Sequence, residues 1–274
     1  MKVAVPSVLE AIIGRTRARL AASPPDAGAV DAALSEAPPV RDVLAALSGP
    51  GPRVIAEFKR HSPARGALAD GADPGEVARI YEAAGAAAVS VLTEPERFLG
   101  SFVDLRRASR AVRIPTLCKD FVVDPRQIPL ARIHGASLVL LIAAALEDRE
   151  LRDLREGIEA LGMQALVEAH DAVEVQRAVD SGATIVGVNS RNLHTLTIDL
   201  SVAELLRPTI PAGVLAVAES GISTPDDLAR LARAGYDVFL IGSSLMTHPD
   251  PAAHLRALIA AGVGAGAGTR VGAG

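Results

Sequence analysis

Residues 53–66 read RVIAEFKRHSPARG, and they place an acid and a base inside an otherwise apolar run. The segment VIA at 54–56 begins what is typical of a buried β-strand, yet Glu57 and Lys59 follow before the run is over. Side chains two apart along a strand point to the same face. The stretch therefore predicts a buried strand whose end presents a carboxylate and an ammonium to one interior space.

Seven similar runs follow at regular intervals along the chain. They are AAVSVLT from Ala87, TLCKD from Thr116, LVLLIA from Leu138, ALVEAH from Ala165, IVGVN from Ile185, LAVAES from Leu215 and VFLIG from Val238. Helical patterns with Asp or Thr caps, an early proline and a closing glycine lie between them, at 73–85, 124–135 and 224–235. Pro129 predicts that the helix within 124–135 is short or kinked.

Strands that alternate with helices pair in parallel and are buried on both faces. Eight evenly spaced units favour a closed (β/α)8 TIM barrel, which we expect over residues 51–261, rather than an open doubly wound sheet. Residues 1–50 predict an N-terminal helical extension that begins with an amphipathic helix and contains a linker at 21–30. The Gly/Ala-rich residues 262–274 predict a flexible tail.

Composition narrows the class of function. The 274 residues carry a net charge of −4 with no basic block, and aromatic residues make up 3% with no Trp, so nucleic acid is not an expected partner. The one cysteine, Cys118, excludes an internal disulfide framework. We find no signal-peptide pattern, and the longest apolar run, 138–146, is too short for a bilayer. We therefore expect a soluble cytoplasmic protein without membrane contact.

Polar residues stand at the carboxyl ends of the predicted strands, where a barrel of this type has its active site. A charge just past a strand is usually a solvated loop residue, but its recurrence at six of the eight strands favours a common site. The candidates are Glu57, Lys59, Ser90, Lys119, Glu168, Asn189, Arg191, Glu219, Ser220, Gly242 and Ser243.

Lysine is rare here, and its positions are informative. Of 28 basic residues three are lysines, which leaves 25 arginines, and Lys59 and Lys119 both end strands. An ammonium can be brought toward neutrality by burial or a neighbouring cation, whereas a guanidinium cannot, so we expect a lysine that donates a proton. Chance together with a salt bridge is the alternative. The two asparagines of the chain, Asn189 and Asn192, also fall together.

Glycine and serine follow the last two predicted strands, in SGIST and GSSLM. Backbone N–H groups at Gly221, Gly242 and Ser243, with a short helix after Gly242, predict a phosphate site. Cys118 should turn away from the lumen because it precedes Lys119. The six histidines lack metal-ligand spacing, and we expect a loop role for His170.

In order and spacing, IAEFKRHSP, SVLTEPERFLGS, KDFVVDPRQI, LVEAH, VGVNSRNL, ESGI and LIGSSLM resemble indole-3-glycerol-phosphate synthases. The resemblance runs from Val8 to about Leu258. It implies a (β/α)8 barrel that closes the indole ring of 1-(2-carboxyphenylamino)-1-deoxyribulose 5-phosphate, with loss of carbon dioxide and water. It implies neither a cofactor nor a metal.

The resemblance also implies roles for single residues. Lys119 matches the general acid, and Lys59 matches the lysine that holds the substrate carboxylate and assists later proton transfer. Glu57 matches the charge partner of that lysine, and Glu168 the carboxylate of dehydration. Asn189 and Arg191 match residues that position the substrate, and Glu219 and Ser220 match the rim of the site. Phe121 and Leu141 match the apolar wall. The residues that match the phosphate-binding site are Ser62, Gly221, Gly242 and Ser243.

One motif departs from the family, which often has Ser-Pro-Ser where this chain has Ser62-Pro63-Ala64. We expect altered affinity at most. A phosphoribosylanthranilate isomerase would need a cysteine in the lumen, which Cys118 does not supply. A non-catalytic phosphate-binding paralogue, and the same activity in a specialised-metabolite pathway, also remain open. We expect a monomer or a weak homodimer.

Overall fold

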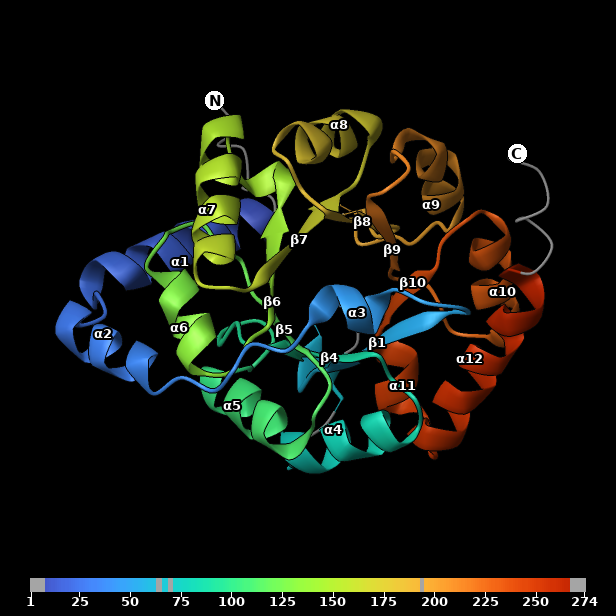
Figure 1. The fold of residues 1–274 in the computed structure, drawn as a ribbon, viewed down its shortest axis with the longest axis horizontal. Coiled ribbons are helices and arrows are strands. Elements are labelled where there is room, and N and C mark those ends of the chain that lie inside the picture. Colours follow the sequence, from blue (N-terminus) through green and yellow to red (C-terminus); the bar gives the residue numbers. More distant parts are fainter. Residues whose placement is uncertain (1–7, 63–65, 69–70, 193–194, 267–274) are drawn as a thin grey trace.

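The computed structural model describes residues 8–62, 66–68, 71–192 and 195–266, and its centre is a ring of parallel strands (Figure 1). The strands are β1 (Arg53–Phe58), β4 (Ala88–Leu92), β5 (Thr116–Lys119), β6 (Leu138–Ile142), β7 (Gln164–Ala169), β8 (Ile185–Asn189), β9 (Leu215–Glu219) and β10 (Val238–Ile241). Six of them lie within the runs that predict them, while β1 and β7 begin one residue earlier, at Arg53 and Gln164. β1 pairs in parallel with both β4 and β10, so the ring closes into a barrel. The barrel prediction is confirmed, and an open sheet is excluded.

Helices surround the strands on the outside (Figure 1). They are α4 (Pro74–Ala83), α5 (Phe102–Ala111), α6 (Gln127–Ile133), α7 (Asp148–Ala160), α8 (Ala172–Asp180), α9 (Ser201–Leu206), α10 (Pro225–Arg233), α11 (Ser243–Thr247) and α12 (Pro251–Gly266), with 3-10 turns η1 (Ala143–Ala145) and η2 (Arg207–Thr209). The expected caps form at α4 and α10, where Asp73 accepts from the N–H of Glu76 and Thr224 from that of Asp227.

α6 is short, as Pro129 predicts, but it starts later than the Asp-Pro signal at 124 suggests. Its N-cap is Arg126, which makes no side-chain capping bond. Pro129 therefore falls in the first turn, where its missing N–H would have had no helical partner.

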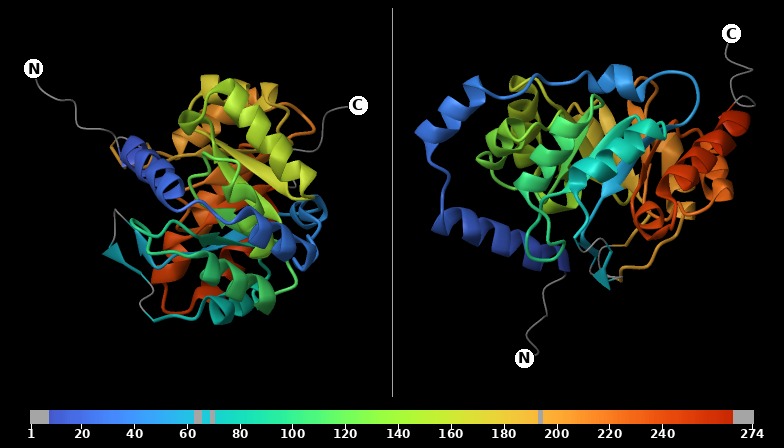
Figure 2. Two further views of the ribbon diagram at one scale, coloured as in Figure 1. Left: turned by 90° about the vertical axis from the view of Figure 1, so that its left-hand side faces the viewer. Right: turned by 90° about the horizontal axis from the view of Figure 1, so that it is seen from below.

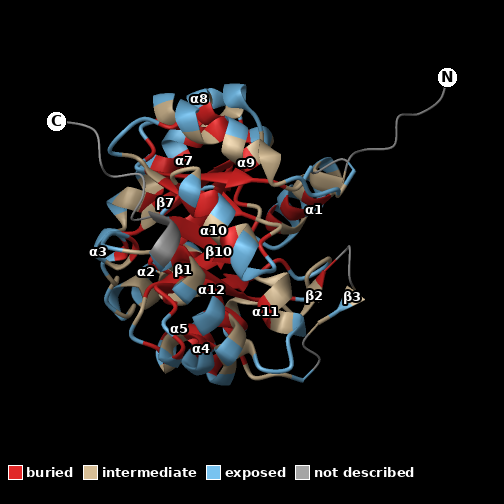
Figure 3. Ribbon diagram, turned by 90° about the vertical axis from the view of Figure 1, so that its right-hand side faces the viewer, coloured by how far each residue is buried: buried red, intermediate tan, exposed pale blue. Residues whose placement is uncertain are grey.

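Two apolar layers make up the core, and strand alternation separates them. Ile55, Leu117, Leu140 and Leu166 belong to a cluster inside the barrel. Their strand neighbours pack with the helices in a second, larger cluster. Figure 3 shows both as buried strands beneath helices whose outer faces are exposed. Charged side chains on the inward face therefore sit where solvent enters only from the ends.

The N-terminal extension consists of α1 (Val8–Ala22), α2 (Ala27–Ser35) and α3 (Val43–Leu47). It runs from one end of the barrel along its side to the other end, with α1 and α3 at opposite ends (Figure 2). Ile12 and Leu20 are the buried apolar residues of α1. The predicted linker at 21–30 is too long, because Asp26 accepts a hydrogen bond from the N–H of Ala29 and so starts α2 early.

Two other segments differ from expectation. A short antiparallel pair, β2 (His61–Ser62) and β3 (Gly66–Ala67), follows β1 and was not predicted. The predicted tail begins inside α12, which continues to Gly266, while 267–274 lie outside the described residues. Among the described helices, none combines the length and apolar character that a membrane crossing requires.

Candidate active site

A cavity of about 630 Å³ lies at the carboxyl ends of the strands and is bordered by α1. Strand ends and the loops that follow them supply most of its lining, and Val8, Leu9 and Ile12 of α1 supply the rest of one side. Thirteen residues predicted for the site line this cavity: Glu57, Lys59, Ser62, Lys119, Phe121, Glu168, Asn189, Arg191, Glu219, Ser220, Gly221, Gly242 and Ser243. Ser90, also considered at a strand end, is buried and does not line it.

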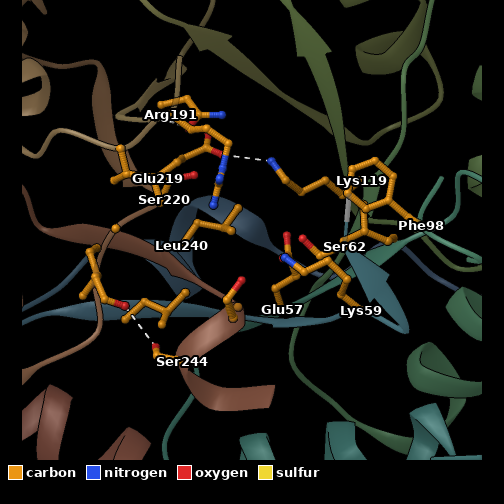
Figure 4. A pocket seen from close by; sticks show the side chains of 18 of the residues that line it. Glu57, Lys59, Ser62, Phe98, Lys119, Arg191, Glu219, Ser220, Leu240 and Ser244 are labelled. Carbon is orange, nitrogen blue, oxygen red and sulfur yellow. Dashed lines mark hydrogen bonds and ion pairs between the residues drawn. The ribbon is translucent and has the colours of Figure 1, made fainter. Parts of the chain in front are cut away.

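Lys119, the last residue of β5, lies between two buried carboxylates. Its Nζ is 3.1 Å from Oε2 of Glu168 on β7 and 2.9 Å from Oε2 of Glu219 on β9. Figure 4 shows Lys119 and Glu219 reaching toward each other. Burial alone would lower the pKa of Lys119, but the charges of Glu168, Glu219 and Glu57 outweigh it and raise that pKa above the ordinary value. The contacts with Glu168 and Glu219 therefore stabilise Lys119 as an ammonium.

Glu168 has partners on both carboxylate oxygens. In addition to Lys119, its Oε1 accepts a hydrogen bond of 3.0 Å from Nδ2 of Asn189, at the end of β8. The same Oε1 lies 3.4 Å from Nε2 of His170. Burial would raise the pKa of Glu168, but Lys119, His170 and Asn189 together lower it well below the ordinary value. Glu168 is therefore ionised.

Among the described residues, Glu219 has a hydrogen-bond partner on only one of its carboxylate oxygens. Its Oε1 is buried and has no hydrogen-bond partner among the described residues. Burial raises the pKa of Glu219, Lys119 opposes the shift, and the nearby charge of Glu168 adds to it, so the pKa lies above the ordinary value. The two acids on Lys119 thus differ, because their surroundings lower the pKa of Glu168 and raise that of Glu219.

Lys59 and Glu57 form a second ion pair on the opposite side of the pocket. Nζ of Lys59 lies 2.5 Å from Oε1 of Glu57, and the two side chains are 11% and 5% exposed. A Cβ on Gly242 would come within 2.3 Å of that same oxygen, so the chain needs glycine there to seat the carboxylate. Glu57 in β1 and Lys59 directly after the strand therefore face the cavity together, as the alternation predicts (Figure 4).

The two asparagines play different structural parts. Asn189 donates to Glu168 and accepts from the backbone N–H of Arg191 at 3.0 Å, which ties the start of the next loop to the pocket. The guanidinium of Arg191 donates to the carbonyl of Leu196. Asn192 accepts from the N–H of Thr195 in a turn and does not line the cavity.

The prediction of the apolar wall is wrong at one residue, Leu141. Leu141 does not line the cavity, because it points outward into the layer beneath the helices, and Leu140 and Ile142 line it instead. β6 is apolar on both faces, so its sequence does not reveal which residues point inward. Phe121 is in the wall as predicted. Phe98 was missed, although it follows a strand closely, and its ring centroid lies 6.2 Å from that of Phe121.

Ser62, Gly221, Gly242 and Ser243 all line the cavity. Ser220 has a φ of 64° and Gly221 a φ of 86°, so the chain turns sharply after β9. Such a conformation is uncommon for serine, and backbone strain of this kind clusters at functional sites. Ser244, which was not predicted, donates to the carbonyl of Ile222 at 3.0 Å and links the loops after β9 and β10 (Figure 4).

The two chain neighbours of Lys119 have structural roles. Cys118 belongs to the outer layer, as alternation predicts. Asp120 accepts from Thr93 Oγ1 at 2.6 Å and from the N–H of Phe121, so it orients the loop behind Lys119. No group of His, Cys, Asp and Glu suited to a metal ion occurs within the described part of the chain.

Comparisons with known proteins agree with one another. The family profile described as "Indole-3-glycerol phosphate synthase" matches residues 9–258. Proteins of that name from Parafrankia sp. and Rhodococcus opacus are 50% and 49% identical over 93% of this chain and 96% of theirs. Among solved structures, a 3-hexulose-6-phosphate synthase superposes with a TM-score of 0.60 at 16% identity, over 76% of this chain and 99% of that one. An N-acetylmannosamine-6-phosphate 2-epimerase from Clostridium perfringens gives 0.59 at 15%, over 74% and 90%, and both likenesses concern the fold alone.

Proposed function

The chain belongs to the indole-3-glycerol phosphate synthase family, and we propose how its pocket residues divide that reaction among themselves. The enzyme is a carboxy-lyase of tryptophan biosynthesis. It converts 1-(2-carboxyphenylamino)-1-deoxy-D-ribulose 5-phosphate into indole-3-glycerol phosphate and releases carbon dioxide and water. Three changes must occur in one pocket: a carbon–carbon bond forms, a carboxylate leaves, and a hydroxyl is eliminated.

Lys119 is the proton donor of ring closure. When the aryl carbon attacks the ribulose carbonyl, negative charge develops on the carbonyl oxygen and needs a proton. The contacts of Lys119 with Glu168 and Glu219 keep it as an ammonium, which is the form that can donate. This ammonium, fixed between two carboxylates deep in the cavity, is the observation that carries the assignment.

Lys59 binds the substrate carboxylate and assists the later proton transfers. Its partner Glu57 limits its movement while leaving further ammonium protons free for a second anion. A carboxylate bound here is oriented for departure as carbon dioxide, which restores the aromaticity of the ring.

Glu168 serves the dehydration. Loss of water requires a base for the neighbouring proton and an acid for the leaving hydroxyl. Glu168 is ionised and within contact of Lys119, so we assign the base to Glu168 and the acid to Lys59. Asn189 orients Glu168, Arg191 and Glu219 position the substrate, and Ser220 shapes the rim.

The rest of the cavity suits the two ends of the substrate. Backbone N–H groups and hydroxyls at Ser62, Gly221, Gly242 and Ser243 would bind the phosphate. Phe121, with Phe98 beside it, would contact the aromatic ring.

We further propose a cytoplasmic monomer or weak homodimer. The large exposed apolar side chains of the described residues are spread over many separate elements, which supports the absence of an extensive obligate interface. They are Leu44, Ile80, Leu99, Val103, Val173, Ile198, Leu205 and Val263. Analytical ultracentrifugation over a concentration series would test the assembly.

The assignment of Lys119 is tested by indole fluorescence on mixing enzyme and substrate in buffer treated with a chelator. The chain has no Trp, so protein background is small. We expect Lys119→Met to lower kcat by about 100-fold or more. Lys119→Arg should be nearly as slow, because a guanidinium keeps the charge but does not release its proton. Arg149→Met removes an exposed cation of α7 and is the control that should retain full activity.

Substrate binding decides between an enzyme and a non-catalytic paralogue. Turnover by the unaltered chain, with Lys119→Met inactive yet still binding substrate by calorimetry, supports the proposal. Binding without turnover in the unaltered chain would contradict the catalytic role. Retained kcat in Lys119→Met would contradict the assignment of this residue alone.

A further inference from the structure

His170 lies directly behind the pocket wall, between two carboxylates. Its Nε2 is 3.4 Å from Oε1 of Glu168, and its Nδ1 is 2.9 Å from Oε2 of Glu174. Nε2 is buried, and apart from this ion pair it has no hydrogen-bond partner among the described residues. The ring does not line the cavity, so it can affect the substrate only through Glu168.

The local sequence EAHDAVE, residues 168–174, explains this arrangement. Glu168 and His170 are two residues apart at the end of β7 and point to the same side. Asp171 then caps α8 by accepting from the N–H of Glu174. Glu174, in the first turn, reaches back to both the backbone N–H and Nδ1 of His170. The start of α8 thus fixes the ring against the strand that carries Glu168.

The hydrogen-bonding capacity of the ring indicates its charge. A neutral imidazole has one donor nitrogen and one acceptor nitrogen, whereas an ionised carboxylate accepts only. Each ring nitrogen faces a carboxylate oxygen. In either neutral tautomer, the nitrogen that carries no proton would therefore point its lone pair at a lone pair of a carboxylate oxygen. The imidazolium donates toward both oxygens and removes this conflict.

We propose that His170 is a positioning residue which, as an imidazolium held by Glu174, keeps the carboxylate of Glu168 ionised and oriented toward Lys119. The proposal rests on the role in dehydration assigned to Glu168 above. It explains why, of two carboxylates on the same lysine, this one acts as the base. Both acids contact Lys119, but Glu168 also contacts a second cation, His170. Among the described residues, Glu219 contacts no cation other than Lys119.

The surrounding charges act in the same direction. Lys119 and His170 are the cations that face Glu168, while Glu219 is the like charge near it and Glu57 acts on Lys119 from across the pocket. Burial would lower the pKa of His170, but Glu168 and Glu174 raise it to about 10. The ring therefore stays charged throughout the neutral range.

The test measures the ionisation of Glu168 directly as well as the rate. Protein labelled with ¹³C at the glutamate side-chain carboxyl is titrated by NMR, and Glu168→Gln identifies the Glu168 signal. We expect His170→Gln, which keeps a donor but loses the charge, to move this titration upward by about one pH unit or more. The acid limb of the kcat profile should move upward by the same amount, while KM changes little.

Two further variants keep the test decisive. Glu174→Gln leaves the ring in place but weakens its charge, so it should shift Glu168 in the same direction by less, and it serves if His170→Gln does not fold. His134→Gln is the matched control, because His134 is a partly buried histidine of another helix end that contacts Leu130 and Phe102 rather than the pocket. It should leave both profiles unchanged.

The outcomes separate this proposal from the one it rests on. If Glu168 titrates at the same pH in folded His170→Gln as in the unaltered chain, His170 has only a structural role and the proposal is wrong. If the NMR titration shifts but Glu168→Gln retains full kcat, then His170 controls Glu168 as proposed, and the dehydration role of Glu168 fails.

Discussion

Two glycines make room for the charged centre of the pocket. A Cβ on Gly187 of β8 would lie 2.0 Å from Oε1 of Glu219, and one on Gly242 would lie 2.3 Å from Oε1 of Glu57. No side chain can approach another atom so closely, so the carboxylate would have to move. Glycine at these two positions therefore leaves room inside the barrel for the carboxylates that contact Lys119 and Lys59.

Gly187→Ala should displace Glu219 and weaken its contact with Lys119. We expect kcat/KM to fall by about tenfold or more, because a misplaced catalytic group loses much of its effect. Steady-state kinetics by indole fluorescence provides the measurement. Gly14→Ala in α1, where the new Cβ meets nothing within 4 Å, is the control and should leave kcat/KM unchanged. Equal kinetics in both variants would refute the close-approach argument.

At the scale of the element, α1 is the helix whose position matters most for the site. Its first turns line the cavity, and it is tied to the barrel by Arg15 with Glu96 and by the bond from Arg126 to the carbonyl of Leu20. The Arg15–Glu96 pair is exposed and contributes little. Buried apolar contacts such as those of Ile12 therefore seat this helix.

Ile12→Ala should loosen the cover over the pocket. Truncating a buried isoleucine to alanine lowers the free energy of unfolding by about 2–5 kcal/mol where packing is complete. The loss is smaller where the helix can unfold locally without the rest of the molecule. We expect KM to rise several-fold with a smaller change in kcat, because α1 contributes wall rather than reacting groups. Kinetics and amide exchange of α1 would measure the two effects. An unchanged KM together with faster exchange would show that α1 does not cover bound substrate.

At the scale of the whole molecule, the buried carboxylates make stability depend on pH in opposite ways. Glu168 has a lowered pKa, so it stabilises the folded state above its ordinary value of 4.5, and this stabilisation is lost as pH falls. Glu219 has a raised pKa. Above 4.5 the unfolded chain releases the proton of Glu219 while the folded chain retains it, so rising pH favours unfolding.

Glu219→Gln should therefore stabilise the protein increasingly with pH. Replacing the acid by a neutral amide removes the cost of burying a charge that is incompletely paired. We expect the difference in Tm between variant and unaltered chain to grow from about pH 5 to about pH 8, while activity falls. Thermal unfolding followed by circular dichroism would measure it. A Tm difference that is constant over this range would mean that Glu219 does not carry a raised pKa.

The sequence by itself determined the eight strands, the starts of α4 and α10 and the polar residues at the strand ends, because alternation, caps and turns depend on neighbours along the chain. Lys59, Lys119 and Glu168 could be placed in the lumen for this reason. The tertiary structure alone decided which face of the wholly apolar β6 turns inward, and so replaced Leu141 by Leu140 and Ile142. It also placed Lys119 between Glu168 and Glu219, and His170 behind Glu168. The pKa of a buried group depends on its burial and on charges that the fold brings together from distant parts of the chain. A local sequence pattern does not reveal these long-range contributions.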